Sequence, residues 1–200
     1  MRRRSWLLPA LLATVAVAPA AHAYDPEQTF RKGTFVVSPE ASYGEQFDLE
    51  GKSGFTDLSF VNAGVRFGWL PLAPLGRDTP VYGALEIALE PLYQQYLEPE
   101  RVYFAGLGLV FRYHFLSLGR FVPWLDLGAF AGGTNLKIKE IRSDFTFLLW
   151  GGLGASYFVT DRTAIYAGYR YQHVSNGNTS RPNRGFESNT GVLGVSFYFE

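Results

Sequence analysis

The sequence predicts an all-β protein, an eight-stranded antiparallel barrel of the kind that spans a bacterial outer membrane. Apolar and polar residues alternate strictly over segments of ten or more residues, longer than most strands of soluble proteins. Aromatic residues make up 16% of the chain and glycine accounts for 22 of its 200 residues, yet the mean hydropathy is only −0.01. Alternating lipid-facing and lumen-facing residues produce this combination. Composition alone also fits a soluble β-sandwich.

The first 23 residues have the pattern of a secretory signal peptide. Three arginines at 2–4 precede an apolar run over 6–18, and Ala21-His22-Ala23 gives the small-x-small sequence that signal peptidase accepts. We expect cleavage before Tyr24, which leaves residues 24–200 as one barrel domain. Removing three arginines and no acid changes the formal charge from 0 to −3. This balance gives no support for nucleic-acid binding, and a chain without cysteine has no disulfide and no thiolate metal site.

Eight segments of the remaining chain have the period of a strand. In order they are Gly33–Tyr43, Leu58–Trp69, Val81–Glu90, Val102–Phe115, Phe121–Gly132, Phe145–Val159, Ala164–Ser175 and Glu187–Phe199. The second and third alternate apolar residues with Arg66, Glu86 and Glu90, and the fourth is apolar at every odd position from Tyr103 to Phe115. The polar residues of the opposite faces are expected to pair inside a filled lumen; they are Arg66, Glu86, Glu90, Arg112, His114, Asp126 and Arg170.

The connections between these strands alternate in length. Residues 116–120 and 160–162 are short, whereas 44–54, 92–100, 133–143 and 176–186 are longer and polar. Short turns on the periplasmic side and long loops outside are expected of outer-membrane barrels. The proline-rich connection 70–80 is the exception, because it is longer than a periplasmic turn is expected to be.

Common enzyme motifs are absent, but the end of the seventh strand carries reactive residue types. There is no G-x-S-x-G elbow, no H-E-x-x-H and no phosphate-binding glycine loop. His173 and Ser175 are two residues apart, so they share one strand face. That face is the apolar one, which predicts that both project toward lipid. If the following hairpin turns around Ser180, Glu187 lies opposite His173 on the same outward face.

A hydroxyl, an imidazole and a carboxylate in this order suit acyl transfer. Ser175 would attack, His173 would take its proton, and Glu187 would orient the imidazole and stabilise its charged form. The backbone N–H groups that follow Ser175, at Asn176 and Gly177, would hold the oxyanion together with the side chain of Asn176 or Asn183. No further cluster of carboxylates and imidazoles suggests a metal site.

The stretch His173-x-Ser175-Asn176-Gly177, followed by Arg181-Pro182-Asn183-x-Gly185-x-Glu187, resembles the signature of the PagL family of outer-membrane lipid A 3-O-deacylases. The motif covers about fifteen residues and departs from some members at Asn178, where they have glycine. The resemblance implies hydrolysis of the ester-linked 3-hydroxyacyl chain of lipid A in the outer leaflet. It also implies a Ser-His-Glu triad, with Asn183 assisting the oxyanion. Lipopolysaccharide would be the substrate, outer-membrane lipids the surroundings, and no cofactor would be needed.

Two other functions fit parts of the sequence. A small non-catalytic barrel could serve adhesion or envelope structure. A palmitoyl-transfer barrel is the third reading, but by resemblance such enzymes have their active site in the lumen, against the parity of His173 and Ser175. The sequence leaves open whether the chain forms a homodimer and which acyl length it prefers.

Overall fold

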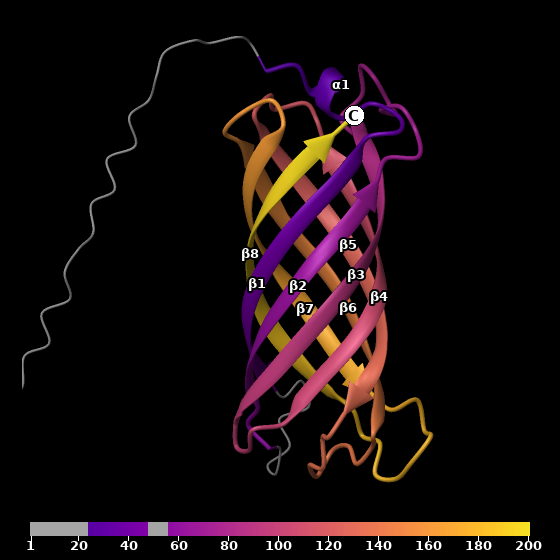
Figure 1. Ribbon diagram of the computed structural model, residues 1–200, viewed down its shortest axis with the longest axis vertical. Coiled ribbons are helices and arrows are strands. Elements are labelled where there is room, and N and C mark those ends of the chain that lie inside the picture. The colour runs from indigo at the N-terminus through magenta and orange to yellow at the C-terminus, as the bar shows by residue number, and fades with distance from the viewer. Residues whose placement is uncertain (1–23, 48–55) are drawn as a thin grey trace, which may run out of the picture.

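A computed structural model describes residues 24–47 and 56–200 and shows one sheet closed on itself as a barrel (Figure 1). Every strand is antiparallel to its neighbours, and the first strand closes the barrel by pairing with the last. The expected signal peptide and part of the first long loop lie outside the described residues. The elements are α1 (Pro26–Thr29), β1 (Phe35–Phe47), β2 (Ser59–Trp69), β3 (Gly83–Glu98), β4 (Tyr103–Phe115), β5 (Phe121–Thr134), β6 (Phe145–Phe158), β7 (Thr163–Ser175) and β8 (Phe186–Phe199).

The eight predicted strands are all present, which confirms the fold class, and two of them continue four or more residues past their predicted ends. β1 continues to Phe47 and β3 continues to Glu98, where the sequence predicted ends at Tyr43 and Glu90. The predicted long loop at 92–100 is therefore wrong. Gln94, which resembles a loop residue, is fully buried in the lumen and accepts a hydrogen bond from Gln172 Nε2 (3.0 Å).

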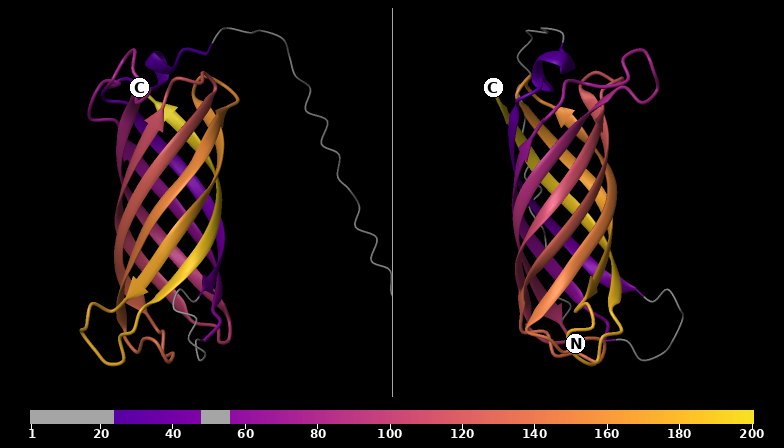
Figure 2. Two further views of the ribbon diagram at one scale, coloured as in Figure 1. Left: turned by 180° about the vertical axis from the view of Figure 1, so that it is seen from behind. Right: turned by 90° about the vertical axis from the view of Figure 1, so that its right-hand side faces the viewer.

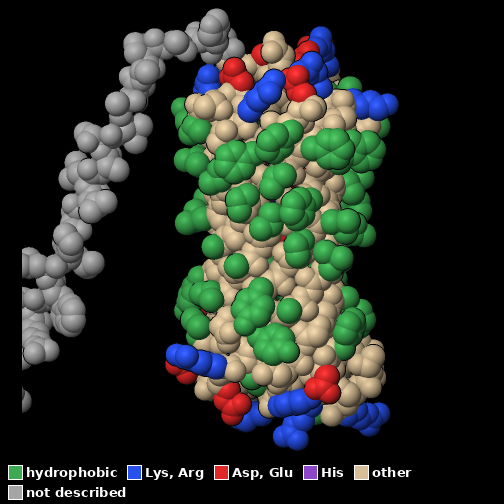
Figure 3. Space-filling model, in the orientation of Figure 1, with side chains coloured by type: hydrophobic (Ala, Val, Ile, Leu, Met, Phe, Trp, Pro, Cys, Tyr) green, Lys and Arg blue, Asp and Glu red, His purple; other side chains and the backbone are tan. Residues whose placement is uncertain are grey.

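The barrel has an apolar outer wall and a polar centre, the reverse of a soluble protein. Leu193 on the wall is 66% exposed, whereas Arg66 and Arg112 inside are fully buried. In Figure 3 apolar side chains form a band around the barrel, with charged side chains at both ends. An outward apolar band with polar residues inside is the arrangement of a membrane barrel.

Side chains fill the interior in three layers. At the centre, Arg66 Nε bonds Glu86 (3.0 Å) and Arg112 bonds Asp126 (2.7 Å), while Arg170 bonds Glu40 (3.0 Å) and Asp126 (3.2 Å). His114 Nε2 contacts Glu86 (2.8 Å), so its role is structural. The predicted pairing of inward charges is confirmed for these residues. Apolar clusters cover the centre on both sides; one includes Phe30, Leu70, Leu116, Phe158 and Tyr198, and the other includes Phe60, Tyr96, Phe104, Leu148 and Phe186.

The two ends of the barrel differ. α1, the C-terminus and the short β4–β5 and β6–β7 turns lie at one end, and the loops 135–144 and 176–185 lie at the other (Figures 1 and 2). The long β2–β3 connection, residues 70–82, belongs to the end with α1 and the C-terminus. It packs on the N-terminal segment, since Glu27 contacts Arg77 and accepts a hydrogen bond from the Tyr82 hydroxyl (3.0 Å). Its length therefore reflects a packing role at this end.

In the described ranges, 24–47 and 56–200, no helix is long and apolar enough to cross a membrane.

Candidate active site

The end of β7 carries His173 and Ser175 on the outer wall of the barrel. The even-numbered residues Arg170 and Gln172 are buried in the lumen, and the odd-numbered Tyr169 is exposed on the wall. His173 and Ser175 continue the odd series and are both half-buried. Strand alternation thus places the imidazole and the hydroxyl side by side toward the membrane.

Glu187, at the start of β8, lies directly opposite His173 in the β7–β8 ladder. Its Oε1 atom is 3.0 Å from His173 Nδ1, and the two side chains are 26% and 36% exposed, respectively. A carboxylate at this distance favours the tautomer with the proton on Nδ1. Nε2 is then left as the acceptor, which is the state that a general base requires.

The Ser175 hydroxyl forms no hydrogen bond with any other described residue. Its neighbour across the β6–β7 ladder is Phe147, so the serine lies at the border between the apolar wall and the loop end. The structure therefore brings His173 and Glu187 into contact and places Ser175 beside them without a serine–histidine hydrogen bond. Catalytic hydrogen bonds of this kind often tighten only when substrate binds.

The β7–β8 loop, residues 176–185, is organised by the buried side chain of Asn176. Its Nδ2 donates to the carbonyl of Ser180 (3.0 Å), and its Oδ1 accepts from the N–H of Asn178 (3.0 Å). The backbone N–H of Asn176 donates to Oδ1 of Asn183 (2.9 Å). The backbone N–H and the side-chain amide of Asn176, both predicted to bind the oxyanion, thus donate within the loop. Other groups must therefore donate to a substrate.

Two of the predicted oxyanion donors keep a hydrogen to give. The N–H of Gly177 has no acceptor among the residues described. The Asn183 amide donates one hydrogen to Asn178 Oδ1 (3.1 Å), which leaves its second hydrogen for a ligand. Asn178 has a φ of +63°, a left-handed conformation that asparagine tolerates better than most residues. Asparagine can therefore occupy this position with less strain than most residues that carry a Cβ.

Two further residues support this arrangement, and the sequence predicted no role for either of them. Gly185 has a φ of +67°, and a Cβ built there would lie 2.8 Å from His173 Cε1. Glu140 is buried in the β5–β6 loop and accepts hydrogen bonds from the N–H (2.8 Å) and the hydroxyl (2.6 Å) of Thr56. The motif contained Gly185, but no sequence signal points to Glu140, because its contact joins residues 84 positions apart.

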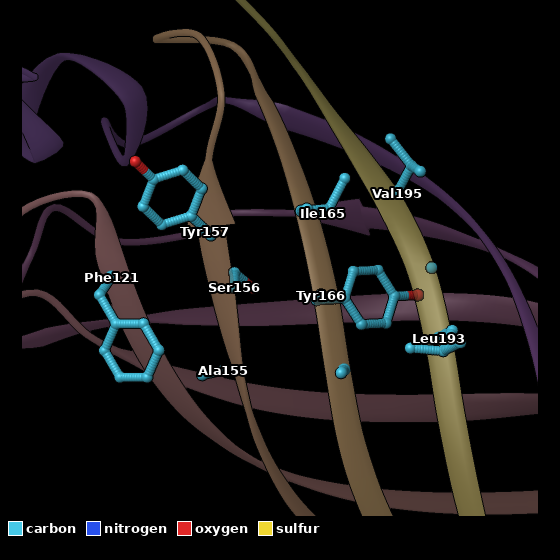
Figure 4. A pocket seen from close by; sticks show the side chains of 10 residues that line it. Phe121, Ala155, Ser156, Tyr157, Ile165, Tyr166, Leu193 and Val195 are labelled. Carbon is cyan, nitrogen blue, oxygen red and sulfur yellow. The ribbon is translucent and has the colours of Figure 1, made fainter. Parts of the chain in front are cut away.

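A groove on the outer wall lies away from this site, and no metal-binding cluster accompanies the site in the described part of the chain. A groove of about 510 Å³ on the outer wall, lined by apolar residues such as Phe121, Ile165 and Leu193, lies near the opposite ends of β6, β7 and β8 (Figure 4). It is therefore separate from the His173–Glu187 pair. Within 24–47 and 56–200, no group of three or more His, Cys, Asp or Glu residues is placed to hold a metal ion.

Comparison with known proteins places the chain in a family. The family model described as lipid A 3-O-deacylase (PagL) matches residues 61–196, more than half of the 200 residues and a range that includes His173, Ser175 and Glu187. The chain belongs to the PagL family. No curated protein sequence matches it.

Solved structures confirm the PagL-type fold. The crystal structure of the outer membrane enzyme PagL is 18% identical, with a TM-score of 0.59, and the match covers 80% of this chain and 97% of that one. The crystal structure of Neisserial surface protein A (NspA) is 19% identical, with a TM-score of 0.58, over 84% of this chain and all of that one. At these identities the likeness shows the fold alone. Together with the family it makes this chain an outer-membrane protein of a Gram-negative bacterium.

Proposed function

We propose that this PagL-family member is a lipid A 3-O-deacylase in which Ser175, His173 and Glu187 form the catalytic triad. The observation that carries the proposal is the 3.0 Å contact between Glu187 and His173 Nδ1, beside Ser175, on the lipid-facing wall. The family supports the substrate class, and the geometry supports the roles proposed for the three residues.

The proposed reaction has two steps. His173 Nε2 takes the proton of Ser175 as the hydroxyl oxygen attacks the ester carbonyl, and Glu187 stabilises the imidazolium that forms. The Gly177 N–H and the Asn183 amide donate to the tetrahedral oxyanion. Its collapse breaks the bond between the carbonyl carbon and the sugar oxygen, and that oxygen takes the proton from His173 and leaves as the sugar hydroxyl. Water, activated by the same imidazole, then hydrolyses the acyl-enzyme to a 3-hydroxy fatty acid and regenerates Ser175.

The position of the trio on the barrel favours a membrane lipid as substrate. The trio lies at the loop end, which is the extracellular end of such barrels, and lipid A occupies the outer leaflet there. An enzyme for water-soluble esters would gain nothing from a site that faces lipid. A lumenal acyl-transfer site is disfavoured, because the interior beside β7 is filled by the buried Arg170 and Gln172.

The test is deacylation by purified, folded variants. Ser175→Ala and His173→Ala should lose roughly 10⁶-fold in kcat, and Glu187→Ala about 10⁴-fold, as in other serine triads. Mass spectrometry of lipid A from mixed micelles measures the loss of one hydroxy fatty acid. Ser59→Ala is the matched control. Ser59 is a half-buried serine on the outer wall, at the start of β2 and at the same end of the barrel as Ser175. This variant should retain wild-type activity.

Two results would overturn the proposal. Wild-type deacylation by folded Ser175→Ala would remove the serine from the mechanism. A folded wild-type protein that releases no fatty acid from lipid A would favour the non-catalytic barrel, whose fold NspA shares.

A further inference from the structure

The two loops beside the candidate triad carry an excess of positive charge. Residues 135–144 and 176–185 contain five cations (Lys137, Lys139, Arg142, Arg181 and Arg184) and two acids (Glu140 and Asp144), a net charge of 5 − 2 = +3. Residues 24–200 as a whole have 15 cations and 18 acids, a net charge of −3. The positive charge is therefore concentrated at this part of the rim.

The two acids do not neutralise the whole cluster. Glu140 is buried and both its oxygens are bound by Thr56, while Asp144 pairs with Lys137 (2.5 Å). Lys139, Arg142 and Arg181 are exposed and form no ion pair with any residue in 24–47 or 56–200. We refer to these three residues as the basic rim. In Figure 3, Lys and Arg side chains lie along the rim at this end of the barrel.

Backbone pairing brings the basic rim to the catalytic loop. Ile141 and Asn183 form a β-bridge, and on either side of it the Arg142 N–H bonds the Pro182 carbonyl (3.4 Å) and the Arg184 N–H bonds the Glu140 carbonyl (2.8 Å). Asn183 in turn accepts the Asn176 N–H next to Ser175. Arg181 thus lies in the loop that follows Ser175, and Arg142 lies in the loop that pairs with it.

We propose that the basic rim binds a phosphate monoester carried by the sugar of the substrate. The inference rests on the proposed function, because lipid A is a phosphorylated amino-sugar lipid whose phosphates lie on the same disaccharide as its ester-linked chains. Guanidinium groups match phosphate oxygens with two parallel hydrogen bonds. A phosphate bound at Arg142 and Arg181 holds the sugar at the rim while its acyl chain lies along the apolar wall. The ester carbonyl is then presented to Ser175.

A general attraction of cations to an anionic membrane is the competing explanation. Arg101, in the β3–β4 turn at the same end of the barrel, is also exposed and has no ion pair within the described chain. It is not part of the two paired loops. A diffuse electrostatic effect would be shared by Arg101, whereas a phosphate site would not, so Arg101→Gln is the matched control.

The kinetic test compares kcat/KM for phosphorylated lipid A and for dephosphorylated lipid A with the same acyl chains, in mixed micelles. Wild type and Arg101→Gln should prefer the phosphorylated lipid by the same factor. The double variant Arg142→Gln/Arg181→Gln should lower that preference about tenfold or more, the size expected for losing charged hydrogen bonds. An equal preference in wild type and double variant, or an equal drop in Arg101→Gln, would overturn the phosphate site.

A binding arm separates this inference from the proposed activity. In a Ser175→Ala background, binding to nanodiscs that contain either lipid is measured without hydrolysis. Phosphate-dependent binding that the double variant loses supports the basic rim even if no variant ever deacylates the lipid. Ser175-dependent hydrolysis with binding that ignores the phosphate would leave the activity intact and remove the phosphate site.

Discussion

The imidazole of His173 is held from two sides by residues of different kinds. Glu187 binds Nδ1, and Gly185 lies against the Cε1–Nε2 edge of the ring, where an added Cβ would come within 2.8 Å of Cε1 and 3.3 Å of Nε2. Gly185 is thus a positioning residue for the proposed base: it leaves room for the ring that a side chain would displace. Its φ of +67° also favours glycine over any residue with a Cβ.

Gly185→Ala should therefore reduce catalysis more than stability. The added methyl group displaces the ring at Nε2, the atom proposed to take the Ser175 proton, and misplacing a reacting group by about 1 Å can cost on the order of 100-fold in rate. Gly119→Ala is the control, since Gly119 has a similar φ of +61° but nothing within 4 Å of a Cβ. Both variants should lose about 1–2 kcal/mol to backbone strain. Similar deacylation rates in the two variants would show that the ring is not positioned by Gly185.

At the same scale, strand period placed some residues correctly and left others undetermined. Counting back from Ser180 gives the pairing of His173 with Glu187, and the ladder confirms that pairing. The alternation of strand residues could not decide whether the side chain of Asn176 or that of Asn183 donates to the oxyanion. Their hydrogen-bond partners depend on the path of the loop, and the loop uses the Asn176 amide for Ser180. The catalytic roles remain predictions, as does the signal peptide.

Among the elements, the β7–β8 loop is the one on which the proposed oxyanion donors depend. Asn176→Ala removes the donor to the Ser180 carbonyl and the acceptor of the Asn178 N–H. Each of these part-buried hydrogen bonds contributes about 0.5–1.5 kcal/mol, so their loss should open the loop locally without unfolding the barrel. We expect faster hydrogen exchange over 176–185 and about tenfold slower deacylation.

Asn135→Ala provides the comparison for that loop variant. Asn135 Oδ1 accepts the Tyr103 N–H (2.7 Å), so its loss removes a similar hydrogen bond from a different loop. It should leave exchange over 176–185 and deacylation near their wild-type values. Equal effects of the two variants would mean that loss of any loop hydrogen bond slows the enzyme.

At the level of elements, the sequence predicted strands better than it predicted loops. Alternation of outward apolar residues is imposed by lipid and can be read locally. The end of β3 was missed because Pro91 and the two glutamines at 94 and 95 resemble a loop, although Gln94 Oε1 accepts a hydrogen bond across the lumen from Gln172. The contact of Glu140 with Thr56 was out of reach, because it exists only once the barrel has closed.

For the whole molecule, the position of the site follows from how the barrel is filled. A charged layer lies between two apolar layers, and the fully buried Arg66, Arg112 and Trp124 occupy much of its centre. A bulky lipid therefore has no place in the lumen and can meet the chain only along its outer wall. The outward face of β7 and β8 is where the polar trio interrupts that wall.

The buried charges should dominate the stability of the barrel. Arg170 bonds Glu40 and Asp126 and lies 4.1 Å from the centre of the Trp150 ring. Arg170→Met leaves two buried carboxylates short of a partner, which typically costs about 3–5 kcal/mol. Unfolding in urea, followed by the gel shift between folded and unfolded barrel in lipid vesicles, measures the loss.

Arg162→Met supplies the contrast for that measurement. Arg162 pairs with Glu200 at 3.1 Å, but the two side chains are 65% and 52% exposed, so water and salt screen the pair. Its loss should shift the urea midpoint little. If Arg170→Met unfolds at the same urea concentration as Arg162→Met, the central layer does not stabilise the barrel. Where Arg170→Met remains folded it should still deacylate lipid A, because the proposed triad lies on the opposite face of β7 from Arg170.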